Sequence, residues 1–171
     1  YKIGAPSISI CAPDIYIANK AGYLRVCASH TRTDNPLFIP ETGTADDSFA
    51  VNILHAAGDF GAIGICGFGA EHTLKMGGTL TDASRPVADS MQMISMMAPA
   101  LLRHGGTEKI FAVSQDEYQD LTHVLRKNWH ITFYYTSRGK KGSPLGRNMR
   151  VARRLAENPE LFNQRGRAIV Y

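Results

Sequence analysis

Residues 37–66 decide the fold, and they run LFIPETGTADDSFAVNILHAAGDFGAIGIC. Leu37–Ile39 is a short apolar run, which predicts a buried strand. The polar triplet Asp46-Asp47-Ser48 offers an N-cap for a helix over Phe49–Ala57, and Gly58-Asp59 ends that helix. Ala62–Cys66 is a second apolar run that closes on glycine and polar residues. A strand, a helix and a strand with short connections predict a parallel β/α unit.

The same alternation extends towards the N-terminus. Residues 7–16 read SISICAPDIY, and their alternation followed by an apolar run predicts a strand over Ile8–Tyr16. Ile17–Arg32 has helical spacing, and the turn residues Thr33–Pro36 follow it. Three adjacent parallel strands connected by helices are therefore expected.

Beyond residue 83 the pattern changes twice. Ser84–His104 carries apolar residues at helical spacing and predicts a long amphipathic helix, kinked at Pro99, with its methionines in the core. After Gly105-Gly106 short strand-like runs dominate, so a boundary near residue 106 is expected. The elements expected in residues 107–171 are strands at Lys109–Val113, Trp129–Thr136 and Ala168–Tyr171, and a short helix at Val151–Leu161.

The composition is that of a globular protein. The chain has 171 residues, of which 44% are hydrophobic and 20% charged, and no apolar run is long enough to span a membrane. The chain opens on Tyr and closes in a strand-like run, so truncation at both ends is expected. The cysteines Cys11, Cys27 and Cys66 fit no zinc or redox motif, and Cys11 and Cys66 are expected to be buried because they lie in apolar runs. Neither a cofactor nor a metal site is predicted.

Charge is distributed unevenly along the chain. Residues 1–125 contain 8 Lys and Arg against 13 Asp and Glu, whereas residues 126–171 contain 11 against 2. A basic segment of this kind can meet phosphates, but it lacks the regularly interleaved aromatic residues of single-strand nucleic-acid binders. A solvated basic face on a small accessory domain is the preferred interpretation, and nucleic-acid binding is the alternative.

Functional groups in parallel β/α folds gather where strands end. The three predicted strand ends carry, in chain order, Asp14 and Tyr16, then Glu41, then Phe68 with Glu71 and His72. Glu41 stands out, because a carboxylate directly after an apolar run is costly to bury without hydrogen-bond partners or a task. A carboxylate bound only by neighbouring loop amides is the structural alternative.

These segments also resemble a known family. GAPSISICAPDIY (4–16), NPLFIPET (35–42) and GAIGICGFGAE (61–71) are similar to the last three strands of bacterial β-galactosidase-like enzymes, in the glycoside hydrolase clan that includes families 35 and 42. The resemblance covers roughly residues 1–106. It implies the C-terminal β/α units of a (β/α)₈ TIM barrel, followed in residues 107–171 by part of a small β-rich (α+β) domain. It also implies a secreted or periplasmic protein rather than a cytoplasmic one.

The resemblance assigns roles to four residues. Glu41 corresponds to the catalytic nucleophile of a retaining glycosidase that acts on a carbohydrate substrate, and Asp14, Tyr16 and Phe68 correspond to substrate-binding positions. Tyr16 would donate a hydrogen bond that orients Glu41 and favours its charged form, and Phe68 would stack on a sugar face. Packing roles are the alternatives for Tyr16 and Phe68, and capping of the next loop is expected of Glu71 and His72.

The sequence also departs from the family pattern. The acid/base of these enzymes belongs to an Asn-Glu pair after the fourth barrel strand, and no such pair precedes Glu41. Gly67-Phe68 stands where the family has Ser-Pro-Phe or an aromatic platform. The remainder of the barrel is thus required for activity. The rival interpretation is a non-catalytic fragment or inactive homologue that binds carbohydrate or a partner protein.

Overall fold

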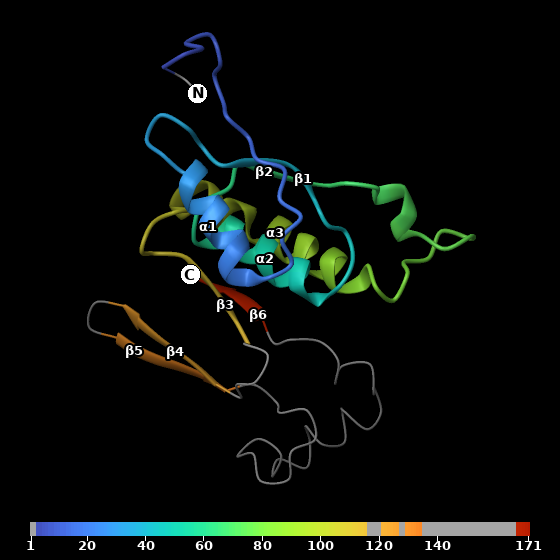
Figure 1. The fold of residues 1–171 in the computed structure, drawn as a ribbon. Coiled ribbons are helices and arrows are strands. Elements are labelled where there is room, and N and C mark those ends of the chain that lie inside the picture. The colour runs from blue at the N-terminus through green and yellow to red at the C-terminus, as the bar shows by residue number, and fades with distance from the viewer. Residues whose placement is uncertain (1–2, 116–120, 127–128, 135–166) are drawn as a thin grey trace. The chain divides into compact units, whose positions relative to one another are not determined.

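The computed structural model describes residues 3–115, 121–126, 129–134 and 167–171. The chain divides into two compact units, Tyr1–Ala112 with Ile169–Tyr171, and Val113–Ala168. Helices and strands are both present, so the predicted mixed α/β class is confirmed. The first unit contains Tyr16, Glu41 and Phe68, and Figure 1 draws most of it in blue, green and yellow.

A small parallel sheet forms the centre of the first unit. Strand β1 (Phe38–Thr42) pairs with β2 (Gly64–Gly67) in parallel, and Ile15 forms a parallel bridge to Thr42 on the other edge of β1. The three segments therefore lie side by side in the order in which they occur in the chain. The predicted parallel pairing of Leu37–Ile39 with Ala62–Cys66 is confirmed.

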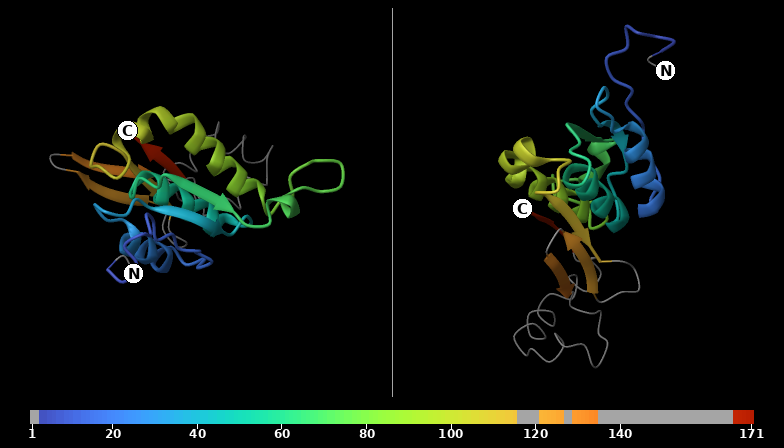
Figure 2. Two further views of the ribbon diagram at one scale, coloured as in Figure 1. Left: turned by 90° about the horizontal axis from the view of Figure 1, so that it is seen from above. Right: turned by 90° about the vertical axis from the view of Figure 1, so that its left-hand side faces the viewer.

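The helices of this unit cover one face of the sheet. Helices α1 (Lys20–His30) and α2 (Asp47–Gly58) connect successive strands, and α3 (Arg85–His104) follows β2. All three lie on the same side of β1 and β2 (Figures 1 and 2). The apolar faces of α1 and α2 meet the sheet in a core that contains Ile15, Tyr23, Cys27, Leu37, Ile39 and Ala56. Helix α3 packs on α2 through a second cluster, which contains Ala50, Ile53 and Val87.

The predicted helices form because local signals and buried faces agree. Asn19 caps α1 by accepting a hydrogen bond from the Gly22 amide, and Asp46 caps α2 by accepting one from Ser48. Asp46 is the first residue of the triplet in which a cap was expected, and α2 begins two residues earlier than the predicted Phe49. Helix α3 runs through Pro99, as expected from its periodicity, and α1 begins three residues later than predicted, at Lys20. The expectation that the methionines of α3 lie in the core is wrong, because the buried residues of this helix are Pro86, Val87 and Ser90 in its first turns, and Met96 is 75% exposed.

The predicted strand over Ile8–Tyr16 is wrong. Of these residues only Ile15 pairs with another segment, and Ile8 and Ile10 are 42% and 38% exposed. The apolar alternation was read correctly, but a strand also needs a neighbour that satisfies its backbone groups. Among the described residues, the backbone of this segment pairs with β1 only at Ile15, and the backbone of Cys11 binds the side chain of Asn35 instead of a strand.

The two expectations about buried cysteines also need correction. Cys66 is exposed and Cys11 is half-buried, whereas the fully buried thiol is Cys27 on α1. Side chains alternate across a strand, and Ile65 takes the helix-covered side of β2. Its neighbour Cys66 therefore falls on the opposite face.

The remaining strands are short. Strand β3 (Phe111–Ser114) pairs with β6 (Arg167–Val170), near the predicted strands at Lys109–Val113 and Ala168–Tyr171. In the second unit, β4 (Leu121–Arg126) and β5 (Trp129–Tyr134) pair antiparallel. Strand β5 was predicted and β4 was not. The predicted helix at Val151–Leu161 lies outside the described residues.

Candidate functional site

Strand β1 contains one residue more than its partner at the point where the candidate nucleophile lies. Ile39 faces Ile65 and Thr42 faces Gly67, so three steps along β1 match two along β2. This irregularity is a β-bulge over Pro40 and Glu41. Proline is tolerated within sheets mainly at edges and bulges, which explains its place here.

The bulge decides which way Glu41 points. Ile39 and Thr42 are both fully buried on the helix-covered side, although they are three positions apart. Strict alternation would have sent Glu41 to the same side as Ile39, into the core. With the extra residue, Glu41 is half-buried and lies on the open face of the sheet.

Backbone hydrogen bonds bring the three predicted strand ends together. The Ile15 amide donates to the Glu41 carbonyl at 2.9 Å, and the Phe68 amide donates to the Thr42 carbonyl at 3.0 Å. The residues that follow these bonds therefore share one edge of the sheet. This is the carboxyl edge, where parallel β/α folds carry their chemistry.

Tyr16 and Glu41 interact directly at this edge. The Tyr16 hydroxyl donates a hydrogen bond to Glu41 Oε2, with a distance of 2.9 Å between the oxygens. The two residues are 25 positions apart, so only the fold brings them together. A single donor on one carboxylate oxygen fixes the orientation of the group and leaves Oε1 available for another partner.

Phe68 completes an aromatic surface beside the carboxylate. Its ring meets that of Tyr16 edge to face, with centroids 6.3 Å apart and an angle of 82° between planes. Phe68 is 61% exposed and Tyr16 is 50% exposed. The core-packing alternative for Phe68 therefore does not describe this ring, which meets solvent next to a carboxylate.

The environment of Tyr16 keeps its hydroxyl protonated. Partial desolvation, the hydrogen bond to Glu41 and the negative charges of Glu41 and Asp14 together raise the pKa of Tyr16 to about 12. The phenol is consequently a hydrogen-bond donor throughout the neutral range. Asp14 contributes as a nearby charge, and it is exposed without a hydrogen bond to another described residue.

Glu71 and His72 stand apart from the pair. They lie in the short helix η1 (Ala70–Thr73) after β2, and His72 Nε2 is 3.5 Å from Glu71 Oε1. The side chain of His72 is 85% exposed and that of Glu71 is 74% exposed. They interact with each other, and the expected capping of the following loop by these side chains is absent from the hydrogen bonds of the described residues.

Three buried polar residues that the sequence did not single out hold this edge together. The Thr42 hydroxyl donates to the Ile15 carbonyl at 2.9 Å and lies 3.3 Å from the Tyr23 hydroxyl. On α2, Asn52 Nδ2 donates to the carbonyls of Ile17 and Ala18 at 3.3 and 3.0 Å. The signal available in the sequence was a polar residue inside an otherwise apolar run, since Asn52 interrupts FAVNILHAA.

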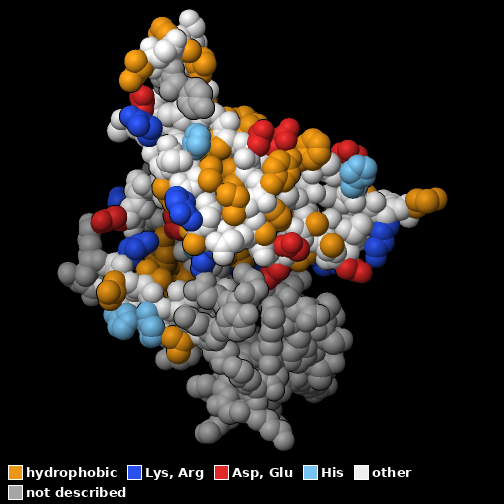
Figure 3. All heavy atoms as spheres, viewed as in Figure 1, with side chains coloured by type: hydrophobic (Ala, Val, Ile, Leu, Met, Phe, Trp, Pro, Cys, Tyr) orange, Lys and Arg blue, Asp and Glu red, His pale blue; other side chains and the backbone are white. Residues whose placement is uncertain are grey.

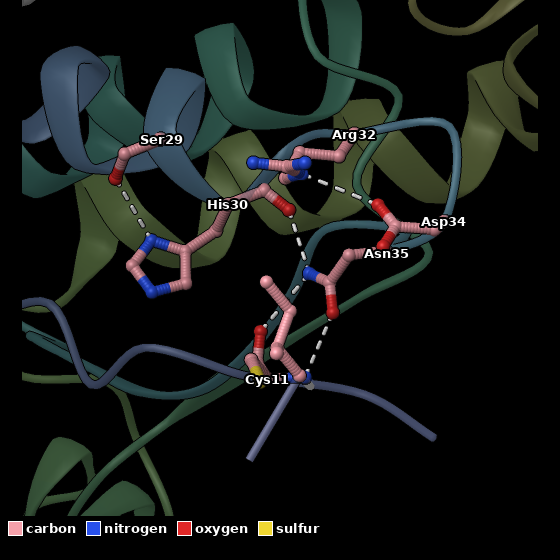
Figure 4. Close-up of a pocket in the computed structure, with 7 residues that line it drawn as sticks. Cys11, Ser29, His30, Arg32, Asp34 and Asn35 are labelled. Carbon is pink, nitrogen blue, oxygen red and sulfur yellow. Dashed lines mark hydrogen bonds and ion pairs between the residues drawn. The ribbon is translucent and has the colours of Figure 1, made fainter. Parts of the chain in front are cut away.

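A cavity also opens at the other end of the sheet. Its volume is about 360 Å³, and it lies beside the loop that leads into β1, whereas Glu41 lies near the end of that strand. Figure 4 shows Asn35 at its centre, bonded to Cys11 and to the His30 carbonyl, with Arg32 paired to Asp34. The polar groups that face this cavity are largely bonded to each other, so the site is assigned to the carboxyl edge.

The described residues contain neither a metal-binding cluster nor a helix that could span a membrane. No three or more His, Cys, Asp and Glu side chains within them are arranged to hold a metal ion. None of the helices described is long and apolar enough to cross a membrane. The basic segment from residue 126 falls largely outside the described residues.

Comparison of the chain with protein-family models and with curated proteins gives no match.

Proposed function

We propose that this chain carries the nucleophile side of a retaining, β-galactosidase-like glycoside hydrolase, with Glu41 as the nucleophile. The observation that carries the proposal is the Tyr16–Glu41 hydrogen bond at the carboxyl edge of the sheet. It joins a half-buried carboxylate, an oriented donor and an exposed aromatic ring in one place. The resemblance of the three strand segments to that family points to the same residue.

The arrangement of helices supports a barrel-type fold over a doubly wound one. Successive parallel segments lie in chain order, and α1, α2 and α3 all cover one face. Doubly wound sheets carry helices on both faces, whereas barrel strands carry them only outside. We therefore propose that the open face is the inward face of a TIM barrel.

Exposed apolar side chains on this unit fit the same proposal. Tyr16, Phe68 and Ile63 are at least half exposed, and Phe38 lies over Gly64 on the uncovered side. Figure 3 shows hydrophobic and acidic side chains mixed on the face of the molecule that is turned to the viewer. The remainder of a barrel, supplied by polypeptide beyond these 171 residues, would cover them.

In the proposed mechanism Glu41 attacks the anomeric carbon and forms a glycosyl-enzyme, while a second carboxylic acid protonates the leaving oxygen and later activates water. Carboxyl groups in retaining enzymes are about 5–5.5 Å apart. The acid is proposed to come from the absent part of the barrel. Tyr16 holds Glu41 for in-line attack, and the Tyr16–Phe68 surface receives an apolar sugar face.

The first experiment changes Glu41→Gln in the complete polypeptide. The fold and sugar binding are expected to persist, and kcat on aryl β-galactosides is expected to fall by roughly 10³-fold or more, an increase in barrier of about 4 kcal/mol. A mechanism-based fluorosugar should label Glu41, as located by mass spectrometry of the digested protein. The 171 residues alone should show no turnover.

Two outcomes would contradict the assignment. A label on Asp14 or Glu71, or near-normal turnover by Glu41→Gln, would make Glu41 a structural carboxylate. The exposed Tyr16–Phe68 surface also suits a protein that only binds carbohydrate. That alternative predicts sugar binding that is lost in Phe68→Ala, together with no turnover by the complete polypeptide.

A further inference from the structure

Tyr16 lies between two sets of hydrogen bonds that come from different elements. On its N-terminal side, the Ile15 amide donates to the Glu41 carbonyl, and the Ile15 carbonyl accepts from Thr42. On its C-terminal side, the carbonyls of the next two residues both accept from the side chain of Asn52 on α2. The backbone at Tyr16 is thus held from β1 on one side and from α2 on the other.

Burial of the Asn52 side chain lowers the stability of the fold. This side chain is completely buried, and its Oδ1 atom has no hydrogen-bond partner among the described residues. A buried unsatisfied acceptor lowers stability, and an apolar side chain of similar size would avoid that cost. Ile17 is 43% exposed and Ala18 is exposed, so their carbonyls could turn to water instead.

We propose that Asn52 is a positioning residue, which fixes the backbone after Tyr16 so that the Tyr16 hydroxyl stays on Glu41. This inference rests on the proposed function of Glu41 for its catalytic meaning, and on the hydrogen bonds alone for its structural meaning. A bond to two successive carbonyls restricts both peptide planes that follow Tyr16. Without these two hydrogen bonds, the backbone that follows Tyr16 can move until it reaches the cap residue Asn19.

The test uses the 171-residue chain with ¹³C at tyrosine Cζ, and Tyr16→Phe identifies the Tyr16 resonance. In the unchanged chain the Tyr16 phenol should resist ionisation to about pH 12. In Asn52→Leu it should ionise about one pH unit lower or more, towards the ordinary tyrosine value, because it has left the carboxylate. Asn52→Ala removes the same donors and serves if the leucine variant does not fold.

Asn35→Leu is the matched control. Asn35 is also a buried asparagine that clasps backbone groups, but it binds Cys11 and His30 rather than the segment after Tyr16. The Tyr16 titration should be unchanged in this variant. An unchanged titration in folded Asn52 variants, or an equal shift in Asn35→Leu, would overturn the proposal.

A kinetic measurement in the complete polypeptide separates this proposal from that for Glu41. Asn52→Leu should lower kcat roughly ten- to a hundredfold and leave KM nearly unchanged, as expected when a reacting group is misplaced by about 1 Å. If the complete polypeptide shows no turnover while the Tyr16 resonance still responds to Asn52, the hydrolase proposal fails and the positioning of Tyr16 stands.

Discussion

Thr42 shows how one buried hydroxyl supports the neighbouring candidate nucleophile. Thr42→Val keeps the shape of the side chain, but leaves the Ile15 carbonyl and the Tyr23 hydroxyl without their partner in the core. The free energy of unfolding should fall by about 1–3 kcal/mol. Urea unfolding of the chain measures this difference.

Thr44→Val is the control for that measurement. The Thr44 hydroxyl donates to the Phe68 carbonyl at 3.1 Å in an exposed position, where water can replace it. Its loss should change stability by no more than about 0.5 kcal/mol. Equal losses in the two variants would mean that burial of the Thr42 network does not stabilise this edge.

Site residues could be predicted from the sequence where a polar or aromatic side chain follows the end of a predicted strand. Glu41, Tyr16 and Phe68 were identified in that way, and the structure brings them together. Asn52 was not, because its partners are backbone carbonyls 34 and 35 residues away, and no local pattern records them.

At the level of elements, the end of α2 depends on a residue without a side chain. A Cβ on Gly58 would lie 2.8 Å from the backbone nitrogen of Ala112, which itself donates to Asp59 Oδ1. Gly58→Ala should therefore destabilise the protein by about 1–3 kcal/mol, although alanine normally favours a helix over glycine. Thermal or denaturant unfolding gives the value.

Gly22→Ala in α1 is the matched helical control. The added Cβ there would lie 2.8 Å from the side chain of the exposed Ile17, which can rotate away, and 3.7 Å from Asn19 Oδ1, which is an ordinary contact. Alanine should leave stability unchanged or raise it by up to about 1 kcal/mol. A neutral Gly58→Ala would show that β3 is not packed closely on α2.

Helices were more predictable than strands for a physical reason. The bonds and caps of a helix are local, so the polar triplet at residues 46–48 and the apolar period were enough to predict α2 to within two residues at each end. A strand requires a distant partner, and the run over Ile8–Tyr16 pairs only at Ile15. Strand β4 was missed for the same reason, because only its pairing with β5 identifies it.

The whole molecule carries groups that should make it sensitive to alkali. Burial raises the pKa of the Cys27 thiol to about 12 and that of the Tyr23 phenol well above its ordinary value. As pH rises, both groups lose their protons at a lower pH in the unfolded chain than in the folded chain. The stability that the protonated Cys27 and Tyr23 give to the folded chain is therefore fully present below about pH 9. It is then lost as pH rises from about 9 towards 12.

Cys27→Ala should make this decline shallower. The denaturant midpoint of the unchanged chain is expected to fall between pH 9 and pH 11, and that of the variant to fall less over the same interval. Guanidinium unfolding at pH 7, 9, 10 and 11 gives both slopes. Parallel curves would show that the Cys27 thiol ionises equally easily in the folded and unfolded chains.

The extra residue in β1 makes chain length, rather than chemistry alone, a determinant of the site. Replacing Pro40 by another amino acid keeps the count between Ile39 and Thr42, whereas deleting one residue there would restore strict alternation with β2. Glu41 would then follow Ile39 directly and lie opposite Cys66, so it would stay on the open face but lose the local bend that sets its direction at the end of the strand. Tolerance of substitution at this position, combined with intolerance of insertions and deletions, is the mutational signature that such a strand should leave.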